Sequence, residues 1–208
     1  MAALVWMLGV VLAGAILTSF HQPFQAADQV VLEHSLHSGH GDWHAVHLLS
    51  GACACSQRNM KRLLRRKPFA SFTEEVVLVD DGTPYLDGSQ ELLDRLSQVG
   101  YSVRHLTPSD LSADTGVRGV PLLLVFAPSG AIAYSGGYGE PDQAVQIFDH
   151  VEHARPQDRL AVFGCAVGRR SQVLADPLGL KYRKPFLRWP SLRTFFRHTP
   201  EKSIEHPY

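Results

Sequence analysis

Two of the three cysteines in the chain lie one residue apart, as Cys53-Ala54-Cys55. They stand where an apolar run gives way to a segment whose apolar residues have helical spacing. At the start of a helix, unpaired backbone N–H groups and the positive end of the helix dipole favour a thiolate over a thiol. The sequence therefore predicts thiol chemistry, with Cys53 as the nucleophile and Cys55 as the second thiol of a redox pair.

The short spacing sets the character of this pair. Residues i and i+2 of a helix point to nearly opposite sides, so a disulfide between Cys53 and Cys55 requires Cys53 to lie outside the helix. The ring that it closes is small and strained, and strain raises the reduction potential, which suits disulfide transfer more than a structural role. The alternative is that both cysteines are small buried residues of a tight turn.

His47 stands six residues before Cys53, on the strand that we expect to lead into the turn. A histidine has an unperturbed pKa of about 6.5 and can take and return the proton of a thiol near neutral pH. His47 is therefore a candidate proton carrier for Cys53. The alternative is a hydrogen-bonded residue of the core.

Histidines are frequent before the cysteine turn. They are His34, His37, His40, His44 and His47. Thiolates and imidazoles suit Cu(I) or Zn(II), so copper handling or an assembly function with Cys and His ligands is an alternative to redox exchange. Histidines at such intervals in a segment with Gly and Ser are also typical of a solvated linker.

Strand and helix patterns alternate through the middle of the chain. We expect strands at 43–50, 74–81 and 101–108, helices at 56–67 and 89–100, a hairpin at 119–139 and a closing helix at 140–155. Ser89 is a candidate cap at the start of the second helix. The pattern predicts an α/β fold, a mixed sheet with helices on both faces.

With Cys53 between a strand and a helix, and "GVP" at 119–121 heading the hairpin, this order resembles the thioredoxin-like superfamily. The resemblance implies a thioredoxin-like mixed sheet flanked by helices over 42–155. It also implies that Pro121 is a cis-proline facing the cysteines, that the partners are protein thiols or disulfides, and that no organic cofactor is needed. The chain departs from the usual Cys-x-x-Cys pair, because Ser56 takes the second position.

Residues 1–20 contain no charged side chain and are about as long as a helix needs to cross a bilayer. A cleaved secretory signal is the alternative. The chain looks most like bacterial membrane-tethered thioredoxin-like proteins. This resemblance implies a single-pass anchor in the inner membrane at 1–20, a spacer at 21–41 and a soluble domain in the periplasm.

The residues after the domain, 156–208, form a C-terminal extension that contains Cys165. If Cys53 and Cys55 form a disulfide, Cys165 is left as an odd thiol, which is a candidate reactive group in an exported protein. Our hypothesis is that the extension folds back and that Cys165 resolves a disulfide on Cys53 or Cys55. The alternative is a buried small residue that holds the extension against the sheet.

Composition sets outer bounds on the function. The 208 residues include 20 Lys and Arg and 20 Asp and Glu, which give a formal net charge of zero. A chain of this length can bury the core of one domain with appendages. The balanced charge gives no general attraction to nucleic acid, and we expect no nucleic-acid partner.

Overall fold

The structure is a computed structural model of the whole chain. It describes residues 2–21, 24, 41–80, 82–107, 117–139, 141–155, 159–167, 172 and 176. The predictions for His34, His37 and His40, and for most of the C-terminal extension beyond 167, lie outside these described residues.

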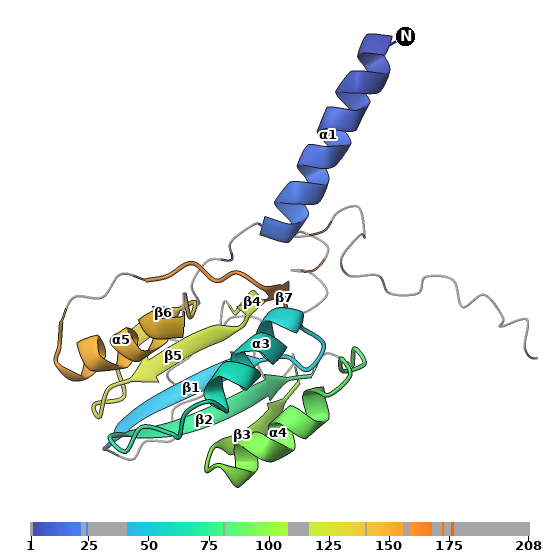
Figure 1. Ribbon diagram of the computed structural model, residues 1–208. Helices are drawn as coiled ribbons and strands as arrows, with labels where there is room; N and C mark the ends of the chain where they lie inside the picture. Colours follow the sequence, from blue (N-terminus) through green and yellow to red (C-terminus); the bar gives the residue numbers. More distant parts are fainter. Residues whose placement is uncertain are drawn as a thin grey trace, which may run out of the picture.

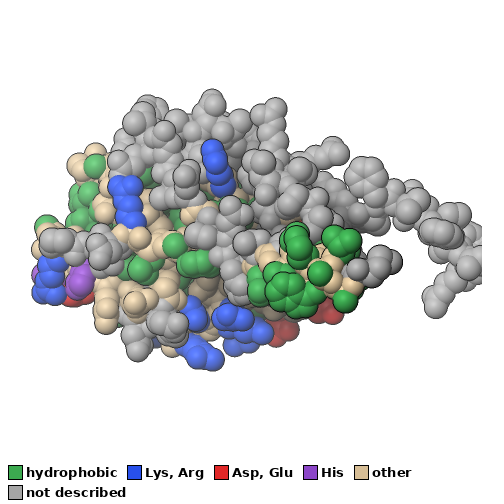
Figure 2. Space-filling view, turned by 90° about the horizontal axis from the view of Figure 1, so that it is seen from above, with side chains coloured by type: hydrophobic (Ala, Val, Ile, Leu, Met, Phe, Trp, Pro, Cys, Tyr) green, Lys and Arg blue, Asp and Glu red, His purple; other side chains and the backbone are tan. Residues whose placement is uncertain are grey.

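The N-terminal helix α1 (Ala2–His21) extends away from an α/β domain (Figure 1). Many of its large hydrophobic side chains are exposed, and Figure 2 shows hydrophobic side chains gathered where α1 rises toward the viewer. Within the described part of the chain, no helix has the length and apolarity that crossing a membrane requires. The membrane-spanning anchor expected at 1–20 is therefore not supported.

The domain is built on a five-stranded sheet with the order β3-β2-β1-β5-β6. Its strands are β1 (Trp43–Leu49), β2 (Phe72–Val79), β3 (Ser102–Leu106), β5 (Leu122–Phe126) and β6 (Ile132–Gly136). The first three are parallel, β5 is antiparallel to β1, and β6 is antiparallel to β5. The central strand β1 is covered on both faces, which explains its nearly continuous apolar run.

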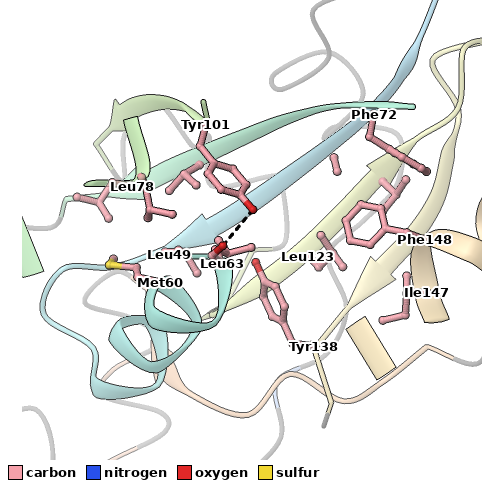
Figure 3. Packing of buried hydrophobic residues seen from close by; sticks show 14 of the residues in the cluster. Leu49, Met60, Leu63, Phe72, Leu78, Tyr101, Leu123, Tyr138, Ile147 and Phe148 are labelled. Atoms are coloured by element: carbon pink, nitrogen blue, oxygen red, sulfur yellow. Dashed lines mark hydrogen bonds between the residues drawn. The ribbon is translucent and has the colours of Figure 1, made fainter. Parts of the chain in front are cut away.

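Three helices cover one face of this sheet. They are α3 (Ala54–Leu63), α4 (Ser89–Gln98) and α5 (Pro141–Glu152), and their buried side chains join one hydrophobic cluster with the strands (Figure 3). A mixed sheet flanked by helices fits the thioredoxin-like fold. We expected helices on both faces, but within the described residues α3, α4 and α5 all pack on this one face, and α1 extends away from the domain.

The other face of the sheet is covered differently. Its cluster includes Val46, Val77 and Leu124, with Phe24 and Val162 packed against it. Phe24 and Val162 come from segments outside 42–155, and they also pair with each other as an isolated bridge. Phe24 and Val162 therefore contribute apolar surface to the face of the sheet on which we had expected a helix.

A second, two-stranded ladder lies beside the main sheet. It joins β4 (Gly119–Val120) to β7 (Cys165–Ala166), with Gly119 opposite Ala166 and Val120 opposite Cys165. The Val167 amide continues the ladder by donating to the Arg118 carbonyl at 2.9 Å. The start of the C-terminal extension is thus part of the fold, next to the loop that contains Pro121.

Candidate functional site: a cluster of three thiols

The turn between β1 and α3 holds Cys53 at the N-terminus of the helix. Cys53 is the cap residue, with extended backbone angles of φ −115° and ψ 119°, and its side chain is fully buried. Its carbonyl accepts the Gln57 amide at 2.9 Å, and its own amide donates to the Ser50 carbonyl at 3.2 Å. Cys53 therefore lies outside the helix proper, as a local disulfide with Cys55 requires.

The loop before α4 fixes this turn from one side. The Gly51 carbonyl accepts two hydrogen bonds, from the Leu86 amide at 2.9 Å and the Ser89 hydroxyl at 2.9 Å. A side chain at Gly51 would meet the ring of Tyr85 at 2.6 Å, so the ring packs directly on the backbone. Gly88, in the left-handed conformation, caps α4 in place of Ser89, and the Ser89 hydroxyl holds the cysteine turn instead.

The loop between β4 and β5 fixes the turn from another side. The sulfur of Cys53 lies 3.9 Å from the carbonyl oxygen of Val120, to which the thiol donates. The peptide bond between Val120 and Pro121 is cis. Pro121 therefore follows directly on the residue that contacts the buried thiol.

Cys165 completes the cluster. It pairs with Val120 across the β4–β7 ladder, and its thiol is hydrogen-bonded to that of Cys53. Cys55 also shares a hydrogen bond with Cys53. The structure thus brings together the three cysteines of the chain, all in the thiol form, with Cys53 buried and the other two half-buried.

The pKa of Cys53 is raised above its ordinary value. The hydrogen bond with Cys165 is the main cause and burial adds to it, whereas Cys55 and the Ser56 amide act in the opposite direction. The helix N-terminus alone predicts a lowered pKa, and that expectation for Cys53 is wrong. The Cys165 thiol and burial outweigh the favourable field of the helix.

His47 lies in β1 with its ring fully buried. Its Nδ1 is 2.8 Å from the Tyr138 hydroxyl, and its Nε2 is 2.9 Å from a carboxylate oxygen of Glu74. A carboxylate can only accept, so Nε2 carries the hydrogen and Nδ1 accepts from Tyr138. Burial lowers the pKa of His47 despite the neighbouring carboxylate, and the ring is neutral.

These contacts do not connect His47 to a cysteine. Both ring nitrogens are taken, and within the described residues neither His47 nor Cys53 has the other as a hydrogen-bond partner. The proton-carrier role expected from the sequence gains no geometric support. The alternative, a hydrogen-bonded residue of the core, describes what the structure shows.

Glu74 is the centre of the buried network around His47, and sequence reasoning missed it. Its side chain is fully buried and accepts from both guanidinium nitrogens of Arg66, at 2.8 and 2.7 Å, and from the Phe69 amide at 2.6 Å. Burial opposes its charge, but the hydrogen bonds of Arg66 and His47 prevail and lower the pKa of Glu74 to about 2. The available signal was the pair of acids Glu74 and Glu75 beside the apolar run at 76–79 of the same strand.

A metal centre has no counterpart in the described residues. No group of three or more His, Cys, Asp or Glu side chains there is arranged to hold a metal ion. His44 stacks on Phe126 and contacts Glu75 at 3.7 Å, on the face of the sheet opposite His47. The two described histidines of the predicted metal set thus lie on different faces.

No protein-family model and no curated protein matches this chain. Several solved structures do. A conserved protein from Geobacillus kaustophilus is 14% identical over 72% of this chain and 89% of its own, with a TM-score of 0.48. A putative thioredoxin from Neisseria meningitidis is 13% identical over 54% and 76%, with a TM-score of 0.43. A thioredoxin-like protein from Aeropyrum pernix is 11% identical over 71% and 97%, with a TM-score of 0.42.

Proposed function

We propose that the protein exchanges thiols and disulfides with protein partners, and that Cys53 and Cys55 form its redox pair. The observation that carries this proposal is the meeting of three thiols at the N-terminus of α3, beside the loop that contains Pro121. A purely structural turn has no need of two further cysteines, Cys55 and Cys165, both next to Cys53. Their contact allows a disulfide to move from one sulfur to the next.

The backbone at the turn is compatible with a local disulfide. Cys53 is extended and outside the helix, while Cys55 is in the first turn. The bond closes a very small ring, and we expect it to be strained and easily reduced. A readily reduced disulfide suits transfer between partners.

We also propose that the protein acts outside the cytoplasm. The support comes from segment 1–20, which is uncharged, apolar and N-terminal, as a cleaved secretory signal is. Determining the N-terminal residue of the protein recovered from cells, together with its cell fraction, tests this location. An intact N-terminus in the cytoplasmic fraction would contradict it.

The exchange function is tested by reducing the disulfides of insulin with the dithiol form of the protein. We expect turnover with a chemical reductant present, and its loss in Cys53→Ser. The matched control is Ser50→Ala, which changes a neighbouring residue of the same turn and leaves the three thiols in place. Insulin reduction by Cys53→Ser at the rate of the unchanged protein would rule out the proposal.

A further inference from the structure

The half-buried Cys165 and the buried Cys53 have different access to a partner. Resting on the proposed exchange function, we infer that Cys165 makes the first attack on a client disulfide, and that Cys53 is the internal thiol that resolves the mixed disulfide. This reverses the order expected from the sequence, in which Cys53 attacks.

Access is the first argument. The Cys53 side chain has no exposed surface, and its sulfur faces the Val120 carbonyl. A protein disulfide must approach the attacking sulfur in line, which requires an open path to that sulfur. Cys165 retains exposed surface, and Phe163, two residues before it, is 57% exposed. Cys165 is therefore more accessible to a client than Cys53 is.

Proximity is the second argument. Val120 pairs with Cys165 across the β4–β7 ladder, and its carbonyl oxygen lies 3.9 Å from the Cys53 sulfur. A mixed disulfide on Cys165 therefore forms next to the Cys53 thiol, which can attack it.

The third argument is that the segment carrying Cys165 is firmly placed. Backbone hydrogen bonds join the Leu160 carbonyl to the Gly137 amide at 2.8 Å and the Val162 carbonyl to the Phe24 amide at 2.9 Å. Any side chain at position 164 would collide with the Val120 carbonyl and lie 2.6 Å from the Pro121 ring. Gly164 thus allows the close approach that brings Cys165 to Cys53.

The reaction balances without any further oxidant or reductant. The Cys165 thiolate attacks the client disulfide, forms a mixed disulfide and releases the first client thiolate, which takes up a proton. Cys53 loses its proton to solvent, attacks the sulfur of Cys165 and releases the second client thiolate. The client disulfide is reduced by two electrons, and Cys53 and Cys165 become joined as a disulfide. Cys55 can then attack Cys53 and return Cys165 to its thiol form.

Three variants that each keep one cysteine test this order. The variant that keeps Cys165 carries Cys53→Ser and Cys55→Ser. The variant that keeps Cys53 carries Cys55→Ser and Cys165→Ser. The variant that keeps Cys55 carries Cys53→Ser and Cys165→Ser. Each is mixed with insulin, and the mixed disulfide is measured by mass spectrometry over time. We expect the protein with Cys165 alone to form it at least ten times faster than the protein with Cys53 alone.

Iodoacetamide labelling of each variant after unfolding checks that the remaining thiol is intact, and circular dichroism checks that the variant is folded. A faster reaction of Cys53 or of Cys55 overturns the inference while leaving thiol exchange in place. If none of the three variants forms a mixed disulfide and Cys53→Ser alone retains insulin reduction, the proposed function itself fails.

Discussion

Val120 and Cys165 face each other across the β4–β7 ladder, and the Val120 carbonyl also accepts from the Cys53 thiol at 3.9 Å. Val120, the residue before Pro121, therefore contacts Cys53 of the turn and pairs with Cys165 of the C-terminal extension. This relationship makes segment 159–167 a part of the thiol site. The cluster of three thiols consequently includes a residue beyond 155, where we expected the domain to end.

The two neighbours of Cys53 should change its pKa in opposite directions. Cys165→Ala removes the neighbour that raises the pKa, so the pKa of Cys53 should fall. Cys55→Ala removes the neighbour that lowers it, so the pKa should rise. The measurement is the rate of Cys53 alkylation against pH, with the modified residue located by peptide mass spectrometry. Shifts of the same sign in both variants would contradict the opposite effects of the two neighbouring cysteines.

Gly164→Ala should separate Cys165 from Cys53 without removing a thiol. The added methyl group collides with the Val120 carbonyl, which is backbone and cannot turn aside. We expect at least a tenfold slower formation of the Cys53–Cys165 disulfide under mild oxidation. The control is Gly164→Ala in a Cys165→Ser background, where the substitution should not further reduce insulin turnover. An unchanged rate of disulfide formation would show that the close approach at Gly164 is not needed.

Ser56→Cys should create a local redox pair with Cys53. Ser56 is buried in the first turn of α3, its amide faces the Cys53 sulfur, and its hydroxyl has no partner within the described structure. In a background with Cys55→Ser and Cys165→Ser, mild oxidation should give an internal disulfide, seen as loss of two titratable thiols.

The control for this new pair is Ser135→Cys in the same background. Ser135 is also a buried serine without a partner in the described structure, but it lies on β6. We expect the Ser135→Cys variant to keep both of its thiols under the same oxidation. An internal disulfide in that variant, and none in the Ser56→Cys variant, would contradict the geometry of the turn.

Glu74→Gln should destabilise the fold strongly. The substitution leaves Arg66 without its charged partner, and breaking a buried pair of this kind costs about 3 to 5 kcal/mol. The matched control is Glu75→Gln on the same strand. Glu75 contacts His44 at 3.7 Å and pairs with Arg104, whose side chain is 39% exposed, so we expect a smaller loss of about 0 to 1 kcal/mol there. Urea unfolding at pH 7 measures both. Equal losses in the two variants would show that burial of the Glu74 network adds nothing.

Acid should weaken the fold in two steps. The pKa of His47 is lowered, so the unfolded chain takes up a proton below about pH 6.5 that the folded chain resists, and stability falls there. Glu74, with a pKa of about 2, contributes stability above its unfolded value of about 4.3, and this contribution is lost as the pH falls toward 2.

The His47 step can be isolated by mutation. His47→Gln should flatten the fall in unfolding free energy between pH 7 and pH 5, while the exposed His153→Gln should leave it as it is. Urea unfolding of both variants at the two pH values gives the comparison. An unchanged pH dependence in His47→Gln would mean that another group causes it.

Sequence patterns alone determined the elements of the central sheet. The apolar run before the cysteines, the strand at Phe72–Val79 and the helix at Ser89–Gln98 follow from local spacing and turn residues, which act within a few positions of the chain. The placement of Cys53 at a helix start follows from the same local rules. The mixed α/β class then follows from the alternation of these elements.

Only the tertiary structure decided the chemistry around the thiols. The helix start predicts a lowered pKa for Cys53, but Cys165 arrives from a distant segment and raises it. His47 faces Glu74 and Tyr138 because strand register and helix packing put those groups on its side of β1. The proton affinity of Cys53 and of His47 depends on burial and on neighbours that folding brings together. The spacing of nearby residues in the sequence does not predict either of these.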